Sequence, residues 1–168
     1  GVESTANDIT PFRAIMNDMY AKDISKKIKS VKRDKQRKGQ FIGGKPMYGY
    51  KMHPTEKNKI VIDEEAAPIV RRIFAMALEG VSCRQIAVRL NEEHIPTPAA
   101  YAGLTLGIKG AYSGLWSSER ISEMLRNETY IGHMVQGRTV KISYKSKKCL
   151  MQAPENWVVV KNTHEPLV

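Results

Sequence analysis

The chain has 168 residues, of which 42% are hydrophobic and 26% charged, so it is long enough to bury a core and is not expected to be disordered. Its 27 Lys and Arg residues against 17 Asp and Glu residues give a net charge of +10, which predicts a polyanionic partner. Two cysteines without a CxxC spacing give little support for a zinc site or a disulfide framework. No apolar run approaches the roughly 20 residues of a membrane helix. The cysteine usage therefore favours a reducing cytoplasm, and the lack of such a run favours a protein without membrane association. Because the chain begins with Gly1 rather than Met, we expect an internal part of a longer protein.

The first predicted element is one long amphipathic helix over residues 10–39. Thr10 followed by Pro11 is typical of an N-cap with proline at the first helical position. Apolar residues then recur at helical spacing from Phe12 to Val31, whereas beyond Val31 only the charge continues. At ~1.5 Å per residue, roughly 28 residues span about 42 Å, which exceeds the width of a small domain, so we expect one end to project.

A glycine-rich linker is predicted next, and it leads into short strands at residues 47–52 and 59–62. Asp63 is predicted to cap a helix that Gly80 ends, and Pro68 can delay the start of this helix by a turn. The capping box formed by Ser82 and Gln85 predicts a further helix over residues 82–93.

Residues 95–115 contain many glycines and prolines and are interpreted as a long loop. A second capped helix is predicted over residues 117–127, followed by strands at 130–136 and 157–160 with a basic loop between them. The predicted fold class is α+β, in which a long N-terminal helix precedes a mainly helical domain with a helix-turn-helix-like pair and small antiparallel strands. We expect three regions, at residues 1–38, 39–58 and 59–168.

The positive charge is concentrated in two segments. Eleven basic residues lie between Lys22 and Lys51 against two acidic ones, and five basic residues with no acid lie between Arg138 and Lys148. Two such segments predict surfaces that follow a phosphate backbone, and the alternative is a solvated helix face followed by a mobile loop. The candidate phosphate contacts are Lys32, Arg33, Lys35, Arg37, Lys38, Lys45, Arg138 and Lys141.

The helices over residues 82–93 and 117–127 carry candidates for base recognition. If they form a helix-turn-helix, the second helix enters a major groove, with Ser117 and Ser118 at phosphate and Arg120 or Glu123 at base edges. Arg84 of the first helix is a further candidate. A conventional turn has three or four residues, whereas some twenty separate these helices, so a helical bundle with incidental surface charge stays open.

Five segments, taken in order, resemble the large serine recombinases that move conjugative transposons and phage genomes. They are AKDISKKIKS at 21–30, GKPMYGY at 44–50, IVIDEEAAPIVRRIFAMALEGVSCRQIAVRLNEEHIPTP at 60–98, LWSSERISEMLRNETYIG at 115–132 and ENWVVVKNTHEPLV at 155–168. The first resembles the end of the long catalytic-domain helix, and the others resemble the linker and the recombinase domain. The glycine-rich stretch at residues 99–114 is longer than this family leads us to expect.

This resemblance implies a site-specific recombinase that integrates and excises a mobile element. Such enzymes pair double-stranded DNA attachment sites in a tetramer and cut through a serine that becomes linked to the 5′ phosphate. The resemblance places that serine and most subunit contacts in a catalytic domain that precedes Gly1, and a zinc ribbon after Val168. We therefore expect no catalytic residue and no cofactor in this chain, and no cleavage by it alone.

Two other function classes stay open from the residues alone. A non-enzymatic helix-turn-helix regulator is also basic with two capped helices, and an RNA-binding protein can use a lysine-rich arm. RNA binding is disfavoured because 7% of the residues are aromatic and none forms a paired stacking motif. Tyr48 and Tyr50 are interpreted as packing residues, and none of the four histidines is assigned chemistry.

Overall fold

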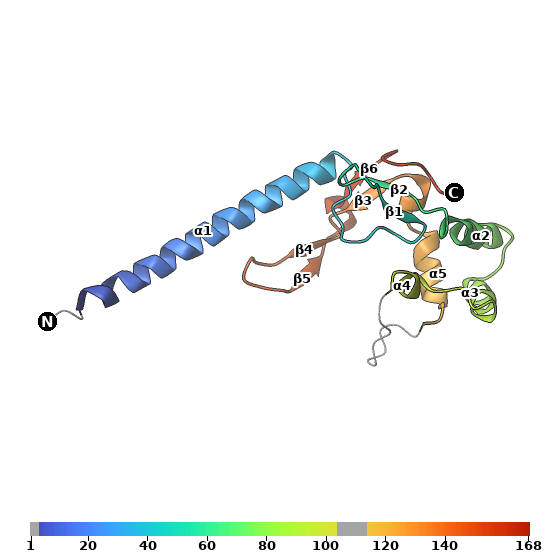
Figure 1. Cartoon of the computed structure of the whole chain (residues 1–168), viewed down its shortest axis with the longest axis horizontal. Helices are drawn as coiled ribbons and strands as arrows, with labels where there is room; N and C mark the ends of the chain where they lie inside the picture. Colours follow the sequence, from blue (N-terminus) through green and yellow to red (C-terminus); the bar gives the residue numbers. More distant parts are fainter. Residues whose placement is uncertain (1–3, 104–113) are drawn as a thin grey trace. The chain divides into compact units, whose positions relative to one another are not determined.

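The computed structural model describes residues 4–103 and 114–168, and its contacts divide the chain into two compact units (Figure 1). One, here called the helix–hairpin unit, contains Gly1–Ile42 and Met134–Val160. The other, here called the helical unit, contains Gly43–His133 and Lys161–Val168. Helices and short antiparallel strands occur in separate segments, which confirms the predicted α+β class.

The helix–hairpin unit is built on helix α1 (Ser4–Arg37). Strand β3 (Met134–Gln136) pairs antiparallel with β6 (Val158–Val160), and β6 also contacts α1. Strand β4 (Thr139–Lys141) pairs antiparallel with β5 (Cys149–Met151), and the 3-10 helix η2 (Pro154–Asn156) precedes β6. The predicted basic loop is therefore wrong in part, because it contains the hairpin of β4 and β5.

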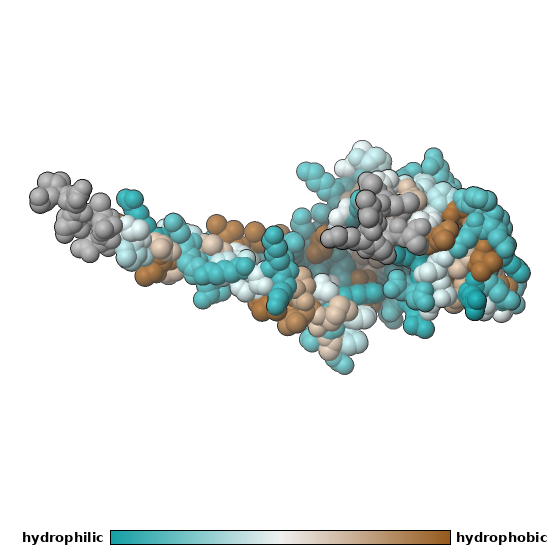
Figure 2. Space-filling view, turned by 90° about the horizontal axis from the view of Figure 1, so that it is seen from below, coloured by the Kyte–Doolittle hydropathy of each residue, from teal (hydrophilic) through white to brown (hydrophobic). Residues whose placement is uncertain are grey.

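Helix α1 begins at Ser4, so the predicted N-cap at Thr10 is wrong, and Pro11 lies inside the helix. Proline lacks an N–H, and the helix continues past it with one backbone hydrogen bond fewer. The apolar residues from Ile9 to Val31 are exposed, with Phe12 at 62% and Met19 at 66%, and their side chains form brown groups along the helix in Figure 2. These apolar side chains have no covering partner among the described residues.

The helical unit combines one small sheet with short helices. Strand β1 (Tyr50–Met52) pairs antiparallel with β2 (Ile60–Ile62), and Lys51 lies opposite Val61. The helices are α2 (Ala67–Leu78), α3 (Cys83–Glu92), α4 (Pro98–Tyr101), α5 (Ser118–Leu125) and the 3-10 helix η1 (Glu128–Ile131). The largest fully buried side chains form the core and are Val70, Ile73, Ile86, Leu90, Ile121 and Tyr130.

Local signals account for most of these helix ends. The capping box of Ser82 and Gln85 is present at α3, and Ser117 caps α5, as predicted. Helix α2 starts at Ala67 rather than at Asp63, which is the delay that Pro68 predicted, and Gly80 follows its end at φ +84°.

Two predicted boundaries are wrong. The loop at 95–115 contains α4, which begins because the Thr97 hydroxyl oxygen accepts from the Ala100 N–H; residues 104–113 of that predicted loop lie outside the described residues. The strand predicted from Tyr130 starts only at Met134. The residues from Glu128 to Ile131 form η1 instead, which Asn127 caps because its side-chain oxygen accepts from the Thr129 N–H.

Candidate nucleic-acid interface

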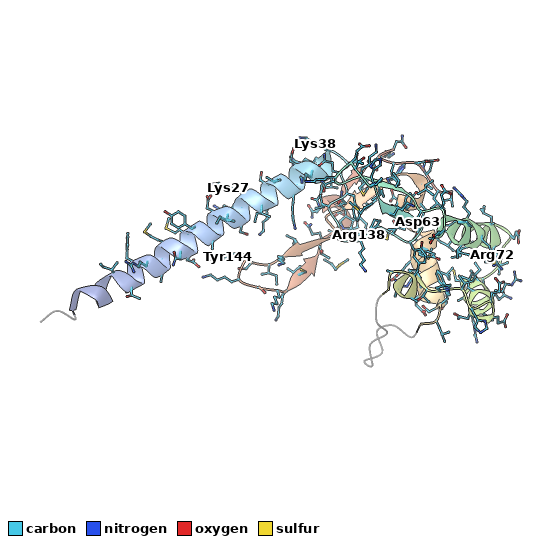
Figure 3. The ribbon with its side chains drawn as sticks, viewed as in Figure 1. Lys27, Lys38, Asp63, Arg72, Arg138 and Tyr144 are labelled. Carbon is cyan, nitrogen blue, oxygen red and sulfur yellow. The ribbon has the colours of Figure 1, made fainter. Side chains whose placement is uncertain are left out.

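The C-terminal end of α1 presents the first group of predicted residues. Five cationic side chains fall within residues 32–38, and all are exposed except Lys35, which is half-buried. Lys38 forms an ion pair with Asp34 at 2.9 Å, one turn earlier on the same helix, and Figure 3 labels Lys38 near the helix end. In the part of the chain that the structure describes, Lys32, Arg33 and Arg37 have no ion-pair partner. This end of α1, here called the basic end, is a dense and largely unneutralised positive surface.

Arg138 and Lys141 lie on the β3–β4 segment of the same unit. The Arg138 guanidinium lies 4.9 Å from the centroid of the Trp157 ring, and the Trp157 indole N–H donates to the Gln152 carbonyl at 3.0 Å. Stacking on a held aromatic ring restricts Arg138, so its charge is better placed than that of a free side chain. Lys141 lies at the end of β4 opposite Cys149 and is exposed.

The tip of the β4–β5 hairpin is attached to α1 through Asp18. The Asp18 carboxylate accepts from the Tyr144 hydroxyl and from Lys145 Nζ, both at 2.6 Å, and Figure 3 labels Tyr144 beside the helix. These hydrogen bonds lower the pKa of Asp18, and the one from Lys145 has the larger effect. Residues 126 positions apart in sequence are joined here. This contact has no signal in the sequence, and our sequence analysis missed it.

Gln136 holds the chain where it leaves α1. Its side-chain Oε1 accepts from the Ile42 N–H at 3.1 Å, and its Nε2 donates to the Gln40 carbonyl at 2.8 Å. One amide side chain thus satisfies a donor and an acceptor of the segment that follows the basic end. The sequence analysis did not single out Gln136.

Helix α5 and its N-cap carry four of the predicted residues, three of them at the N-terminus. The Ser117 hydroxyl oxygen accepts from the Arg120 N–H at 3.3 Å, and the Ser118 hydroxyl donates to Glu119 at 3.2 Å. The pKa of Glu119 is lowered by its own backbone N–H and by Ser117 and Ser118. A carboxylate therefore already occupies the positive end of this helix, which works against a phosphate at Ser117 and Ser118.

Arg120 and Glu123 are exposed on α5, and Arg84 is exposed at the start of α3. Helices α3 and α5 pack against each other, with Ile86 and Leu90 of α3 and Ile121 of α5 fully buried. Among the described residues, Arg120 has no ion-pair partner, so its guanidinium is available to a ligand. The structure thus brings the two predicted helices together.

The linker residues lie in the helical unit and play different parts. Lys45 is exposed and its Nζ reaches the Ala102 carbonyl at 3.5 Å. Tyr50 is 5% exposed, and Tyr48 contacts the rings of Tyr101 and Trp116 edge-on, which confirms both tyrosines as packing residues. Gly49 is buried at φ +93°, and a Cβ there would lie 2.8 Å from Leu167. Its role in this unit is therefore close packing.

Residues 4–103 and 114–168 contain no cluster of three or more His, Cys, Asp or Glu side chains arranged to hold a metal ion. No helix among them has both the length and the apolarity needed to cross a bilayer.

Comparisons with known proteins place the chain in a family. A solved structure described as the crystal structure of an LSR–DNA complex, where LSR denotes a large serine recombinase, matches 84% of this chain at 22% identity with a TM-score of 0.49. The match covers 33% of that structure's chain, so our chain corresponds to about a third of its length. A comparison with curated proteins gave no match. The family model named Recombinase matches residues 64–168, which is more than half of the chain and confirms the resemblance seen in the sequence segments. The chain therefore belongs to the Recombinase family of serine recombinases.

Proposed function

We propose that this chain is the sequence-specific DNA-binding portion of a site-specific serine recombinase that integrates and excises a mobile element, such as a conjugative transposon or a phage genome. The observation that carries the proposal is the family match over residues 64–168, which includes α2, α3, α5 and the β4–β5 hairpin. The partner is a double-stranded DNA attachment site. A net charge of +10, most of it between Lys22 and Lys51, supports a polyanionic ligand.

The proposal divides the work of binding between the two units. In the helix–hairpin unit, the basic end, Arg138 and Lys141 contact phosphates, because exposed cations recognise charge without reading sequence. In the helical unit, α3 and α5 act as a helix-turn-helix-like pair, with Arg120 or Glu123 at base edges and Arg84 beside them. Lys45, within the linker, contributes a further phosphate contact.

Strand cleavage is assigned to the serine of the catalytic domain of the parent enzyme, and this chain alone does not cut DNA. A covalent protein–DNA intermediate is productive only when the cut ends stay in place, so each subunit needs a strong grip on its half-site. This chain supplies that grip and needs no cofactor for it. The proposal also includes a cytoplasmic location and self-association through the catalytic domain.

The proposal is tested with the chain as it is. Duplexes that it selects from a random pool are compared with scrambled duplexes and with double-stranded RNA at two salt concentrations. We expect the selected duplex to bind at least about 10³-fold more tightly than the scrambled one, which is the lower range for specific DNA-binding proteins. Denaturing gels should show neither a nick nor a covalent adduct. Equal binding of selected, scrambled and RNA duplexes contradicts DNA recognition, and a phosphoserine-linked adduct contradicts the assignment of cleavage.

A further inference from the structure

Trp116 is the residue that precedes the N-cap of α5, and its backbone is held by one side chain of α3. Asn91 Nδ2 donates to the Trp116 carbonyl at 3.0 Å, and the Trp116 N–H donates to Asn91 Oδ1 at 2.8 Å. The two hydrogen bonds join a planar amide to both backbone groups of a single residue. Such a two-point contact fixes orientation as well as distance.

The Trp116 side chain is fixed as well. Its indole N–H donates to the Ile95 carbonyl at 2.9 Å, and its ring lies edge-on to Tyr48 at 5.9 Å between centroids. Trp116 is 3% exposed, and all three of its hydrogen-bonding groups have partners. The chain therefore enters α5 from an immobilised position.

These contacts compensate for the long connection between α3 and α5. In a helix-turn-helix, a turn of three or four residues sets the angle between the helices, whereas Asn91 and Trp116 are 25 residues apart. Asn91 lies in the last turn of α3, and Ser117, directly after Trp116, caps α5. The hydrogen-bonded pair thus supplies a short link between the helices that the covalent connection does not supply.

We infer that Asn91 is a positioning residue for base recognition, which sets the rotation and placement of α5 through Trp116 and so aims Arg120 at the DNA. The inference rests on the proposed function. Arg120 lies four residues after Trp116, and its N–H is the donor that the Ser117 cap engages. Because a bidentate arginine contact to a base requires close alignment, loss of the Asn91 link weakens base preference before it weakens phosphate binding.

The central variant is Asn91→Ala, which removes both hydrogen bonds to Trp116. Asn91→Asp is the isosteric companion, because a carboxylate keeps the acceptor for the Trp116 N–H and loses the donor to its carbonyl. Ile73→Val, a fully buried position of α2, is the control that lowers stability without touching the link. Preference is measured as the ratio of affinities for a selected and a scrambled duplex, at a temperature where circular dichroism shows each variant to be folded.

We expect Asn91→Ala and Asn91→Asp to reduce this ratio by about tenfold, which is part of the discrimination that one bidentate contact provides. Affinity for the scrambled duplex should change by less than about threefold. Ile73→Val should leave the ratio unchanged. In an Arg120→Ala background, Asn91→Ala should cause no further loss of preference, because both changes remove the same contact. A merely structural role for Asn91 predicts additive losses in both affinities.

The outcomes separate this inference from the proposed function. A folded Asn91→Ala protein that keeps its preference, or additive losses with Arg120→Ala, overturns the inference and leaves the proposed function standing. If the unchanged protein has no sequence preference, the proposed function fails instead. Amide hydrogen exchange then tests whether Asn91 holds the start of α5. In Asn91→Ala, the amides of Trp116 and Arg120 should lose protection while that of Leu90 keeps it. Equal protection at all three amides overturns the inference.

Discussion

The basic end of α1 and the N-terminus of α5 are the two strongest candidate DNA surfaces, and they are built in opposite ways. The basic end has five cations within residues 32–38, and among the described residues Lys38 is the one that forms an ion pair, with Asp34. The N-terminus of α5 has Arg120 as its cation, on a helix that is capped by Ser117 and linked through Trp116 to α3. One surface has many charges, most of them without an ion-pair partner among the described residues, and the other has one cation on a helix with a tethered N-terminus.

This difference indicates how affinity and specificity are divided. Phosphate contacts gain their free energy from released counterions, and this gain depends on the number of cations rather than on their exact positions. Base edges are distinguished by paired hydrogen bonds, which fail when a side chain is displaced. We therefore expect the basic end to determine how tightly the chain binds any duplex, and α5 to determine which duplex it prefers.

The largest expected effect comes from replacing Lys32, Arg33, Lys35, Arg37 and Lys38 together by glutamine. Affinity for selected and scrambled duplexes should fall alike, by on the order of 10²- to 10³-fold, because up to five phosphate contacts are lost. The slope of log affinity against log salt should become shallower by up to about 4, measured by fluorescence anisotropy at several salt concentrations.

Replacing Lys57 and Lys59, which lie between β1 and β2, by glutamine removes two charges outside the basic end and so measures the effect of net charge alone, per charge lost. This control should change the salt slope by much less. An unchanged salt slope in the fivefold variant places the DNA elsewhere on the protein. A loss restricted to the selected duplex reverses the division of labour between the two surfaces.

The next largest effect concerns stability, and it separates two glycines of the linker. Gly49→Ala should lower the free energy of unfolding by about 2 kcal/mol or more, since it combines overpacking with a positive φ. The added Cβ would lie 2.8 Å from Leu167 and 2.9 Å from Val70. Gly44→Ala, with no atom within 4 Å of the new Cβ, should change stability by less than about 0.5 kcal/mol.

Urea unfolding measures both glycine variants, and DNA binding by Gly44→Ala adds a second reading. If the backbone at Gly44 approaches DNA closely, as glycines in groove-binding segments allow, this variant loses affinity while it keeps its stability. Equal stability losses in the two variants contradict the packing role assigned to Gly49.

A smaller effect is expected for Arg120→Ala. Preference for the selected duplex over its single-base variants should fall by about 1–3 kcal/mol at one base pair, while scrambled-duplex affinity changes little. Competition binding against a set of single-base variants measures this. A uniform loss across the set makes Arg120 a phosphate contact, and no loss moves base recognition to Arg84 or to the segment of Arg138 and Lys141.

Local rules predicted the parts of the fold that depend on a few neighbouring residues. The capping box at Ser82, the cap at Ser117 and the delay caused by Pro68 each require contacts within one helical turn, so the sequence contains them. Pro11 misled the same reasoning, because proline is favoured at a helix start but is also tolerated inside a long helix.

The rest depends on contacts between distant residues, which carry no pattern in a single sequence. Asp18 pairs with Tyr144, Gln136 with Gln40, and Asn91 with Trp116, and Asp18, Gln136 and Asn91 look like ordinary surface residues in isolation. The β4–β5 hairpin was missed because its strands have three residues each and every one is exposed, so no alternation of buried and exposed positions marks it. For this reason the residues that hold the two candidate surfaces in place were the least predictable from the sequence.

The smallest expected effect is a difference between the units in their response to acid, and the two tryptophans report on it separately. Trp116 lies in the helical unit and Trp157 in the helix–hairpin unit, so Trp157→Phe and Trp116→Phe each leave one fluorescent reporter. In the helical unit, burial lowers the pKa of His164 below 6.5. In the helix–hairpin unit, hydrogen bonds from Lys145 and Tyr144 lower the pKa of Asp18 below 3.8.

The signs of these shifts place the two responses in different pH ranges. His164 has Nε2 2.8 Å from the Thr129 carbonyl and Nδ1 2.8 Å from the Thr163 hydroxyl, and the unfolded chain takes up a proton before this buried ring does. Its stabilisation is present above pH 6.5 and is lost as the pH falls from 6.5 to the folded-state pKa, whereas that of Asp18 is lost only below 3.8. Between pH 7.5 and 5.5, the free energy of unfolding that Trp116 reports in urea should therefore decrease modestly. The value that Trp157 reports should not change. His164→Gln keeps a donor for the Thr129 carbonyl but does not titrate, so it should flatten the Trp116 response, and an unchanged response in this variant contradicts the role assigned to His164.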